Sequence, residues 1–322
     1  MMSRALWALL VPFGFSVILS LQSCIESKPP LKVSSHVWPG YEFLFLGKNL
    51  GILDPDQVSL LETNSASESL ELIESGNIDA AALTLDEVLR ARSRGTDLVV
   101  VMVFDISAGA DVLLAKPEYH TIEQLRGKRW GVETSGVGSI MLDQALAKCG
   151  CSREDVSIVD LSADQHAEAW NNNELEAVIT YEPVFSQLME TGARKLFSSR
   201  ETPNLIVDVL AVRRSSISRN EAIEHLIGVH FSALEHFHIQ KDDALFRLAS
   251  RMQIEPADVL GAYRGLLLPN LRNNLRLFAS DNSIIDQASQ KLSTIMYQAG
   301  IIPSADQASD LFEDKFLRNL EH

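Results

Sequence analysis

The chain has 322 residues, of which 46% are apolar and 22% charged, and its formal net charge is −15 at pH 7. That length exceeds what one hydrophobic core usually serves, so we expect two domains. No segment is strongly basic, which argues against a nucleic-acid partner. The acidic balance favours solubility and indicates little about the fold.

The N-terminus has the pattern of an export signal. Arg4 gives a cationic start, and residues 5–19 form an apolar run that a proline and a glycine interrupt. The run is too short and too broken for a membrane span, so we expect a signal peptide over residues 1–23. The segment ends in Leu-Gln-Ser-Cys, which resembles the bacterial lipobox, and a polar tether over 24–30 follows. We therefore expect Cys24 to carry a lipid anchor; the alternative is a plain signal peptide or an anchor helix with an incidental cysteine.

Short β-rich runs alternate with helical patterns between residues 31 and 104. Helices are expected over 41–50, from a capping box at 65–68 to Gly76, and over 86–94. Strands are expected over 31–37, 58–62, 78–83 and 98–104. Strands that alternate with helices of this length predict a parallel sheet with crossover helices.

The same scheme recurs after a second capping box at 121–124. Strands are expected over 129–132, 156–161 and 177–181, and helices over 137–148, from 162–165 onward and over 184–191. From about residue 219 the pattern is mainly helical, with a break at Pro269-Asn270.

Cys149 and Cys151 stand one residue apart near the end of the helix expected over 137–148. Two cysteines alone do not make a four-ligand zinc site, and we expect no metal site and no cofactor. A disulfide between them would close a very small ring, so we expect two thiols at a helix end.

The chain compared with itself shows a repeat at an offset of 97 residues. Residues 78–82 align with 175–179, Gly95 aligns with Gly192, and Asp111-Val-Leu aligns with Asp208-Val-Leu. Chance similarity between α/β units is the alternative, but three matched features at one offset favour true pseudo-symmetry. Two similar α/β halves place equivalent loops on both sides of one cleft, where open α/β sheets bind ligands.

Five short motifs, in their order and spacing, resemble one family. They are Trp38-Pro39-Gly40-Tyr41, Gly76 to Ala81, Gly109-Ala110-Asp111, Leu125 to Val132 and Tyr181-Glu182-Pro183. Together they resemble the nitrate, sulfonate, taurine and thiamine-precursor family of ABC-transporter periplasmic substrate-binding proteins. The resemblance runs from about residue 31 to 213, and more loosely beyond.

The resemblance implies an α/β chain with the type II periplasmic-binding-protein fold, in which two lobes enclose a ligand cleft and two crossover strands join them. The crossovers would lie near 108–114 and 206–212. Lobe one would then comprise residues 31–110 plus 211–322, and lobe two residues 111–210.

The candidate ligand contacts come in pairs, and each pair has a structural alternative. Trp38 and Tyr41 could stack on a ligand or plug the cleft mouth. Thr84 and Asp86 follow a strand, where Asp86 could also cap the next helix. Tyr181 and Glu182 are placed equivalently, and Glu182 could instead favour a helix start. Asp111 and Asp208 could bind ligand or hold the hinge.

The loop 133–139 is rich in small residues, and its amides and hydroxyls would suit an anionic group. It lacks the Gly-Lys-Ser/Thr ending of a phosphate-binding P-loop. In the family that the chain resembles this loop touches ligand, so Thr134 and Ser135 join the candidates.

The candidate positions hold many carboxylates and no Arg or Lys: Asp86, Asp111, Glu133, Glu182 and Asp208. An uncompensated anion such as nitrate would fit poorly among them. We therefore expect a ligand with a cationic or hydrogen-bond-donating nitrogen, such as a zwitterion, an amine or a pyrimidine-like ring, with a sulfonate-type molecule as the other option.

The resemblance implies a monomeric, lipid-anchored binding protein on the periplasmic or cell-surface side of a bacterial membrane, which delivers its ligand to an ABC permease. No catalytic residue is expected. A sensory protein that presents ligand to a membrane receptor is one alternative. An enzyme of the thiamine-pyrimidine synthesis type is another, although those enzymes are cytosolic and carry a cysteine-rich segment that this chain lacks.

Overall fold

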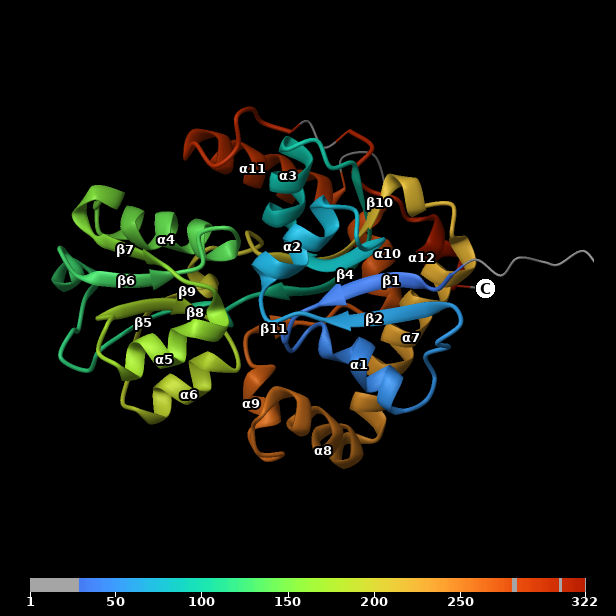
Figure 1. Ribbon diagram of the computed structural model, residues 1–322, viewed down its shortest axis with the longest axis horizontal. Coiled ribbons are helices and arrows are strands. Elements are labelled where there is room, and N and C mark those ends of the chain that lie inside the picture. The colour runs from blue at the N-terminus through green and yellow to red at the C-terminus, as the bar shows by residue number, and fades with distance from the viewer. Residues whose placement is uncertain (1–28, 280–282, 307–308, 322) are drawn as a thin grey trace, which may run out of the picture.

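The computed structural model describes residues 29–279, 283–306 and 309–321. Figure 1 shows two α/β lobes side by side, one of them formed mainly by the green middle part of the chain. The expected signal peptide, Cys24 and most of the tether lie outside the described residues.

The first lobe is built on a six-stranded sheet in the order β11-β4-β10-β3-β1-β2. Its strands are β1 (Leu31–Ser35), β2 (Val58–Glu62), β3 (Ala80–Thr84), β4 (Leu98–Ser107), β10 (Val207–Arg213) and β11 (Leu266–Leu267). The strands β3 and β4 are almost wholly buried, as their continuous apolar runs predict for strands covered on both faces.

The helices of this lobe come from both ends of the chain. They are α1 (Glu42–Asn49), α2 (Ala66–Glu74), α3 (Leu85–Ser93), α7 (Asn220–Ile239), α8 (Lys241–Met252), α9 (Val259–Ala262), α10 (Leu271–Phe278), α11 (Ile284–Gln298) and α12 (Lys315–Asn319). The expected capping box opens α2, where Ser65 Oγ accepts from the N–H of Glu68. The C-terminal region is helical as expected, except for the short β11.

The second lobe has a five-stranded sheet in the order β7-β6-β8-β5-β9. Its strands are β5 (Val112–Ala115), β6 (Arg129–Val132), β7 (Ser157–Asp160), β8 (Ala177–Thr180) and β9 (Arg194–Ser198), and its helices are α4 (Val137–Lys148), α5 (His166–Asn171) and α6 (Val184–Glu190). One apolar cluster packs α4 on this sheet, and a second gathers α5 and α6.

Both sheets are mixed, whereas the alternating pattern predicts purely parallel ones. In the first sheet β10 runs antiparallel to β3 and β4, and in the second β5 runs antiparallel to β8 and β9. These are the strands that follow each passage of the chain between lobes, and a strand that arrives from the other lobe enters the sheet from the opposite end. The predicted boundary at 210/211 falls inside β10, which belongs to the first sheet over its whole length.

The strand registers reproduce the internal repeat found in the sequence. Asp208 on β10 stands opposite Thr84 at the end of β3. Val112 on β5 stands opposite Thr180, so the preceding Asp111 lies beside Tyr181, the repeat mate of Thr84. Each lobe thus forms its corner at the cleft from equivalent residues.

The structure contradicts the expectation of two thiols at the end of α4. Cys149 and Cys151 form a disulfide, with their Cα atoms 5.3 Å apart. The chain turns back between them at Gly150, whose φ of +61° lies in the left-handed region that glycine adopts without strain. This turn brings the two cysteines within the usual Cα separation of a disulfide, which sequence spacing alone does not show.

Candidate functional site

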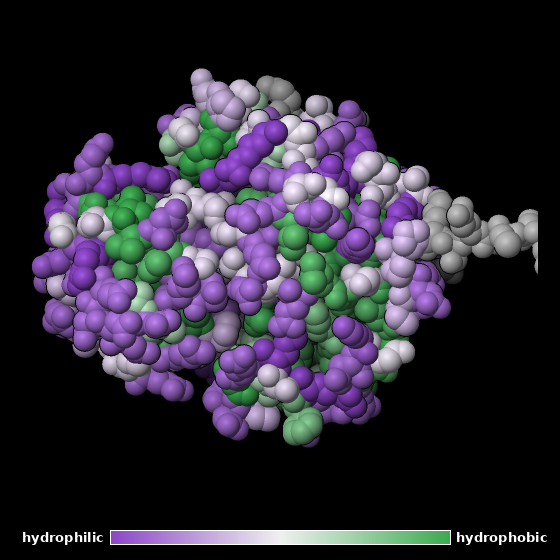
Figure 2. Space-filling model, in the orientation of Figure 1, coloured by the Kyte–Doolittle hydropathy of each residue, from purple (hydrophilic) through white to green (hydrophobic). Residues whose placement is uncertain are grey.

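A small cavity lies between the two lobes, at the strand ends where the sequence places the ligand contacts. Its volume is about 20 Å³, room for one water-sized group. On the face seen in Figure 2, atoms of the two lobes meet along much of their shared boundary. The lining residues are His36, Trp38, Tyr41, Ala66, Thr84, Glu87, Asp111, Glu133, Val137, Tyr181, Ile206 and Asp208.

Aromatic rings from both lobes form one wall of the cavity. The ring of Trp38 meets that of Tyr181 edge to face, with centroids 5.4 Å apart, and His36 meets Tyr41 in the same way at 5.3 Å. Burial lowers the pKa of His36 to about 3, so its ring is neutral at physiological pH. The first lobe supplies three of these rings and the second lobe supplies Tyr181.

Behind this wall, Asp105 on β4 and Asp208 on β10 stand opposite each other. Trp38 Nε1 donates to Asp105 over 2.9 Å, and the hydroxyl of Tyr41 donates to Asp208. Burial, above all, raises the pKa of Asp105 to about 7 and that of Asp208 well above its usual range, and the negative charge of Asp105 adds to the rise for Asp208. Burial and mutual repulsion therefore oppose ionisation of both carboxyls at once.

Three further carboxyls face the cavity. Burial raises the pKa of Asp111 to about 7 and that of Glu87 to about 8, and it also raises the pKa of Glu133. Neither Lys nor Arg occurs among the described residues that line the cavity. The cavity thus gathers acidic groups without a facing cation.

Glu133 and its loop also fasten the lobes together. The backbone N–H of Ser67, on α2 of the first lobe, donates to Glu133 Oε1 over 3.1 Å. The hydroxyl of Ser67 bonds the same carboxyl and the hydroxyl of Ser135. Gly136 lets this loop approach α3, because a Cβ there would lie 2.5 Å from Glu87 Oε1. The loop 133–139 therefore closes the cleft against the first lobe.

Six of the ten predicted ligand-binding residues line the cavity. They come from five separate parts of the sequence, and the two crossover strands bring them together. Their role in ligand binding stays a prediction. They are Trp38, Tyr41, Thr84, Asp111, Tyr181 and Asp208.

The other four candidates lie near the cavity but do not line it. Asp86 is buried in the first turn of α3, where burial raises its pKa and the charge of Arg90 opposes that rise. The remaining three have other partners: Thr134 donates its N–H to Asp160, Ser135 bonds Ser67, and Glu182 accepts from the N–H and hydroxyl of Ser186. Glu182 thus stabilises the start of α6, which is the structural alternative to a role in ligand binding.

His36 and Glu87 line the cavity but are absent from the predicted set. Glu87 is the third residue after Thr84, and its carboxylate accepts from the Thr84 N–H over 2.8 Å. The Thr-x-x-Glu spacing is a capping-box signal that could have marked Glu87 as fixed at this corner. His36 follows β1 directly, and its place at a strand end was the available signal.

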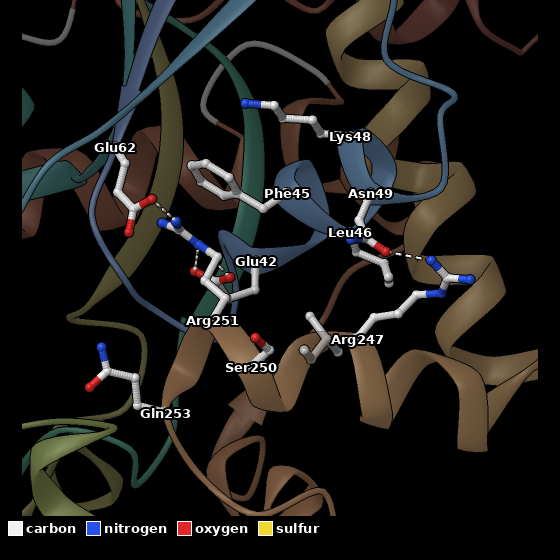
Figure 3. A pocket seen from close by; sticks show the side chains of 11 residues that line it. Glu42, Phe45, Leu46, Lys48, Asn49, Glu62, Arg247, Ser250, Arg251 and Gln253 are labelled. Carbon is white, nitrogen blue, oxygen red and sulfur yellow. Dashed lines mark hydrogen bonds and ion pairs between the residues drawn. The ribbon is translucent and has the colours of Figure 1, made fainter.

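A larger groove of about 570 Å³ lies on the first lobe alone, between α1, α8 and the end of β2 (Figure 3). Its two arginines already have acidic partners. Arg251 pairs with Glu42 and Glu62, and Arg247 pairs with Asp243. Because both arginines are paired and the second lobe takes no part in this groove, we assign ligand binding to the smaller cavity between the lobes.

Within residues 29–279, 283–306 and 309–321, no helix is long and apolar enough to cross a membrane. The same residues contain no cluster of His, Cys, Asp and Glu side chains arranged to hold a metal ion.

A family model described as NMT1/THI5 like matches residues 57–226, which is more than half of the chain. The chain belongs to the NMT1/THI5-like family. The match begins at β2, ends within α7 and includes the whole second lobe.

Two curated relatives of this NMT1/THI5-like chain match over part of their length. A putative aliphatic sulfonates-binding protein of Escherichia coli K12 is 22% identical over 64% of this chain and 66% of its own length. A putative thiamine biosynthesis protein of Haemophilus influenzae is 22% identical over 47% of this chain and 49% of its own length. The chain thus spans about two thirds and about half of these relatives.

The solved alkanesulfonate-binding protein of Xanthomonas axonopodis pv. citri, bound to MOPS, superimposes with a TM-score of 0.75. It is 18% identical, and the match covers 89% of this chain and 99% of that one. This likeness confirms the predicted type II periplasmic-binding-protein fold. Together with the family match it also confirms the resemblance to ABC-transporter substrate-binding proteins that the motifs indicate.

Proposed function

We propose that this NMT1/THI5-like chain is an exported solute-binding protein, which captures a small molecule between its lobes and delivers it to an ABC permease. The observation that carries the proposal is the cavity between the lobes, because both lobes supply its lining. Because residues of both lobes line this site, binding of a ligand is coupled to the movement of the lobes toward each other.

The names of the similar proteins support this proposal. Two of them are called sulfonate-binding, and one was solved with a small sulfonate buffer molecule bound. For this chain we propose a ligand of the same size class, either nitrogen-containing or sulfonate-type. The space of about 20 Å³ is smaller than such a molecule, so a bound ligand would hold the lobes further apart than they stand here.

Capture and release need no covalent step. The ligand would replace contacts that now join the lobes, chiefly those of Ser67 with Glu133 and Ser135. The crossovers allow this motion, because the first joins the sheets through only the four residues between β4 and β5. A permease would then recognise the state in which the lobes have closed on the ligand.

Thermal-shift measurements test ligand binding directly. We expect one class among taurine, alkylsulfonates, nitrate, amines and pyrimidines to raise the melting temperature, because a ligand at 100-fold its Kd stabilises a fold by about 2.7 kcal/mol. Tyr181→Phe removes only a hydroxyl from the cavity and should weaken the effect. Lys48→Ala, in the groove of Figure 3, is the matched control and should leave it unchanged. A shift that depends on Lys48 and not on Tyr181 would contradict the assignment.

We also propose that a lipid on Cys24 anchors the protein. In a bacterial host grown with labelled palmitate, the wild-type chain should carry the label and sediment with membranes. Cys24→Ala should lose both properties, whereas Cys149→Ser/Cys151→Ser keeps Cys24 and should retain them. An unlabelled wild-type protein in the soluble fraction would favour the plain signal peptide instead.

A further inference from the structure

We propose that the cleft selects a small organic cation, whose charged nitrogen sits against Asp111 and Asp208 and whose hydrocarbon part packs on the aromatic wall. The inference rests on the proposed function and names the ligand class for that same site. It also predicts that capture of the ligand releases protons from the carboxyls of the cleft.

The first argument is charge. Four carboxyls line the cavity, Glu87, Asp111, Glu133 and Asp208, and Asp105 lies directly behind them. Arg251 is held by Glu42 and Glu62, and Arg90, whose charge acts on Asp86, does not line the cavity. A buried carboxylate without a counter-charge is costly, and a bound cation would remove that cost.

The second argument is a set of polar atoms without partners. Tyr181 is only 9% exposed, and its hydroxyl has no hydrogen-bond partner among the described residues. The same holds for Oδ2 of Asp111, which is 3% exposed. Buried polar groups of folded proteins are normally paired, so two unpaired atoms that border one cavity indicate a ligand that completes them. A cationic nitrogen beside Asp111 would offset the charge of its carboxylate, and a hydroxyl on the same ligand would pair with the Tyr181 hydroxyl.

The third argument is the wall of rings. His36, Trp38, Tyr41 and Tyr181 surround the space, and aromatic faces and edges beside carboxylates are a recurrent setting for ammonium groups. A sulfonate or nitrate would instead place its oxygens against carboxylates. The groove of Figure 3 has only one aromatic ring, that of Phe45, and Arg251 already lies 3.4 Å from its centroid.

Proton release follows from the protonation of the cavity carboxyls before a ligand binds. Because burial raises the pKa of Asp105 and Asp111 to about 7, and that of Asp208 well above its usual range, the cluster favours bound protons near neutral pH. A cation favours the ionised carboxylates and therefore expels those protons. Affinity should therefore rise between about pH 6 and about pH 8, a range that spans the pKa of about 7 of Asp105 and Asp111. The titratable and charged groups that face this cluster are His36, Tyr41, Asp86, Glu87, Arg90, Glu133, Tyr181 and Tyr263.

Matched probes separate charge from shape. Choline and ethanolamine should raise the melting temperature of the full chain, and the uncharged analogue of choline, with carbon in place of nitrogen, should not. Isethionate, a sulfonate without an amine, serves as the anionic probe. Stabilisation by isethionate or nitrate with none by the cations would overturn the cation inference and leave the binding function standing. No stabilisation by any probe would count against both.

Calorimetry of choline binding in phosphate and in Tris measures the protons released. Choline cannot lose a proton itself, so a difference in heat between the two buffers reports on the protein. We expect net release at pH 7, and equal heats in both buffers would overturn the coupling. Asp111→Asn should weaken choline binding by about 10- to 100-fold. Glu190→Gln, at an exposed acid that does not line the cavity, should leave binding unchanged.

Asp208→Asn gives a readout without any ligand. Carboxyls with raised pKa values contribute stability that is fully present below their unfolded pKa of about 4. That stability is lost as the pH rises through about 7, the pKa of Asp105 and Asp111. We expect Asp208→Asn to melt higher than wild type at pH 8, with a smaller difference at pH 5. A variant that is less stable than wild type at pH 8 would show that the acid cluster needs no counter-charge, and would overturn the inference.

Discussion

Replacing Arg251 with alanine should lower the free energy of unfolding by about 3–5 kcal/mol, because it leaves a buried carboxylate without its partner. Arg251 Nε lies 2.7 Å from Oε2 of Glu42, and the Glu42 side chain is fully buried. Burial already raises the pKa of Glu42 to about 7 despite the charge of Arg251. Chemical denaturation measures the loss.

Two variants control this experiment. Arg247→Ala lies one turn earlier on α8, and its partner Asp243 is exposed, so it should change stability by no more than about 1 kcal/mol. Arg251→Ala/Glu42→Gln removes both charges and should recover part of the loss. If the single and double variants were equally unstable, the packing of Arg251 on Phe45 would explain the effect, and its charge would not.

Replacing Trp38 with alanine should cost about 3–5 kcal/mol of stability and abolish ligand binding. The side chain is 4% exposed, packs in the core of the first lobe and borders the cavity with its ring against Tyr181. Its loss would open a void beside Asp105 and remove the N–H group that donates a hydrogen bond to Asp105.

Trp38→Phe separates the two roles that the sequence leaves open for this residue. Phenylalanine keeps most of the packing and loses the hydrogen bond to Asp105, so stability should fall by only about 1–3 kcal/mol. Binding that survives in Trp38→Phe would identify Trp38 as a plug of the cleft. Binding that disappears would support stacking on the ligand. Phe246→Ala, at an aromatic residue that is 71% exposed, controls for the loss of a ring.

The fold is largely predictable because its elements have local signals. The predicted strands over 58–62 and 129–132 and the helix over 137–148 agree with β2, β6 and α4 at both ends. The direction of β5 and β10 has no local signal, since it depends on which lobe a strand enters. The sequence pattern does not predict the short β11 or the edge strand β9. In β9, Arg194 and Lys195 interrupt the apolar pattern.

The candidate site is predictable where it depends on strand ends. Trp38, Thr84, Tyr181 and Asp208 each lie at or near the end of a strand, and strand ends meet at one edge of a sheet. Thr134 could not be placed in this way, because the direction of a loop side chain depends on how the lobes meet. The sequence also cannot show that Glu182 accepts a hydrogen bond from Ser186, because this depends on where α6 begins.

The position of β10 has a consequence for how the chain folds. This strand lies between β3 and β4 in the centre of the first sheet, yet Asp208 is 124 residues later in the chain than its partner Thr84. The first lobe cannot complete its sheet until the whole second lobe has emerged, whereas the second lobe is one continuous segment. Contacts of such sequence separation slow folding. We expect the second lobe to form first and the first lobe to assemble around β10 in a slower phase.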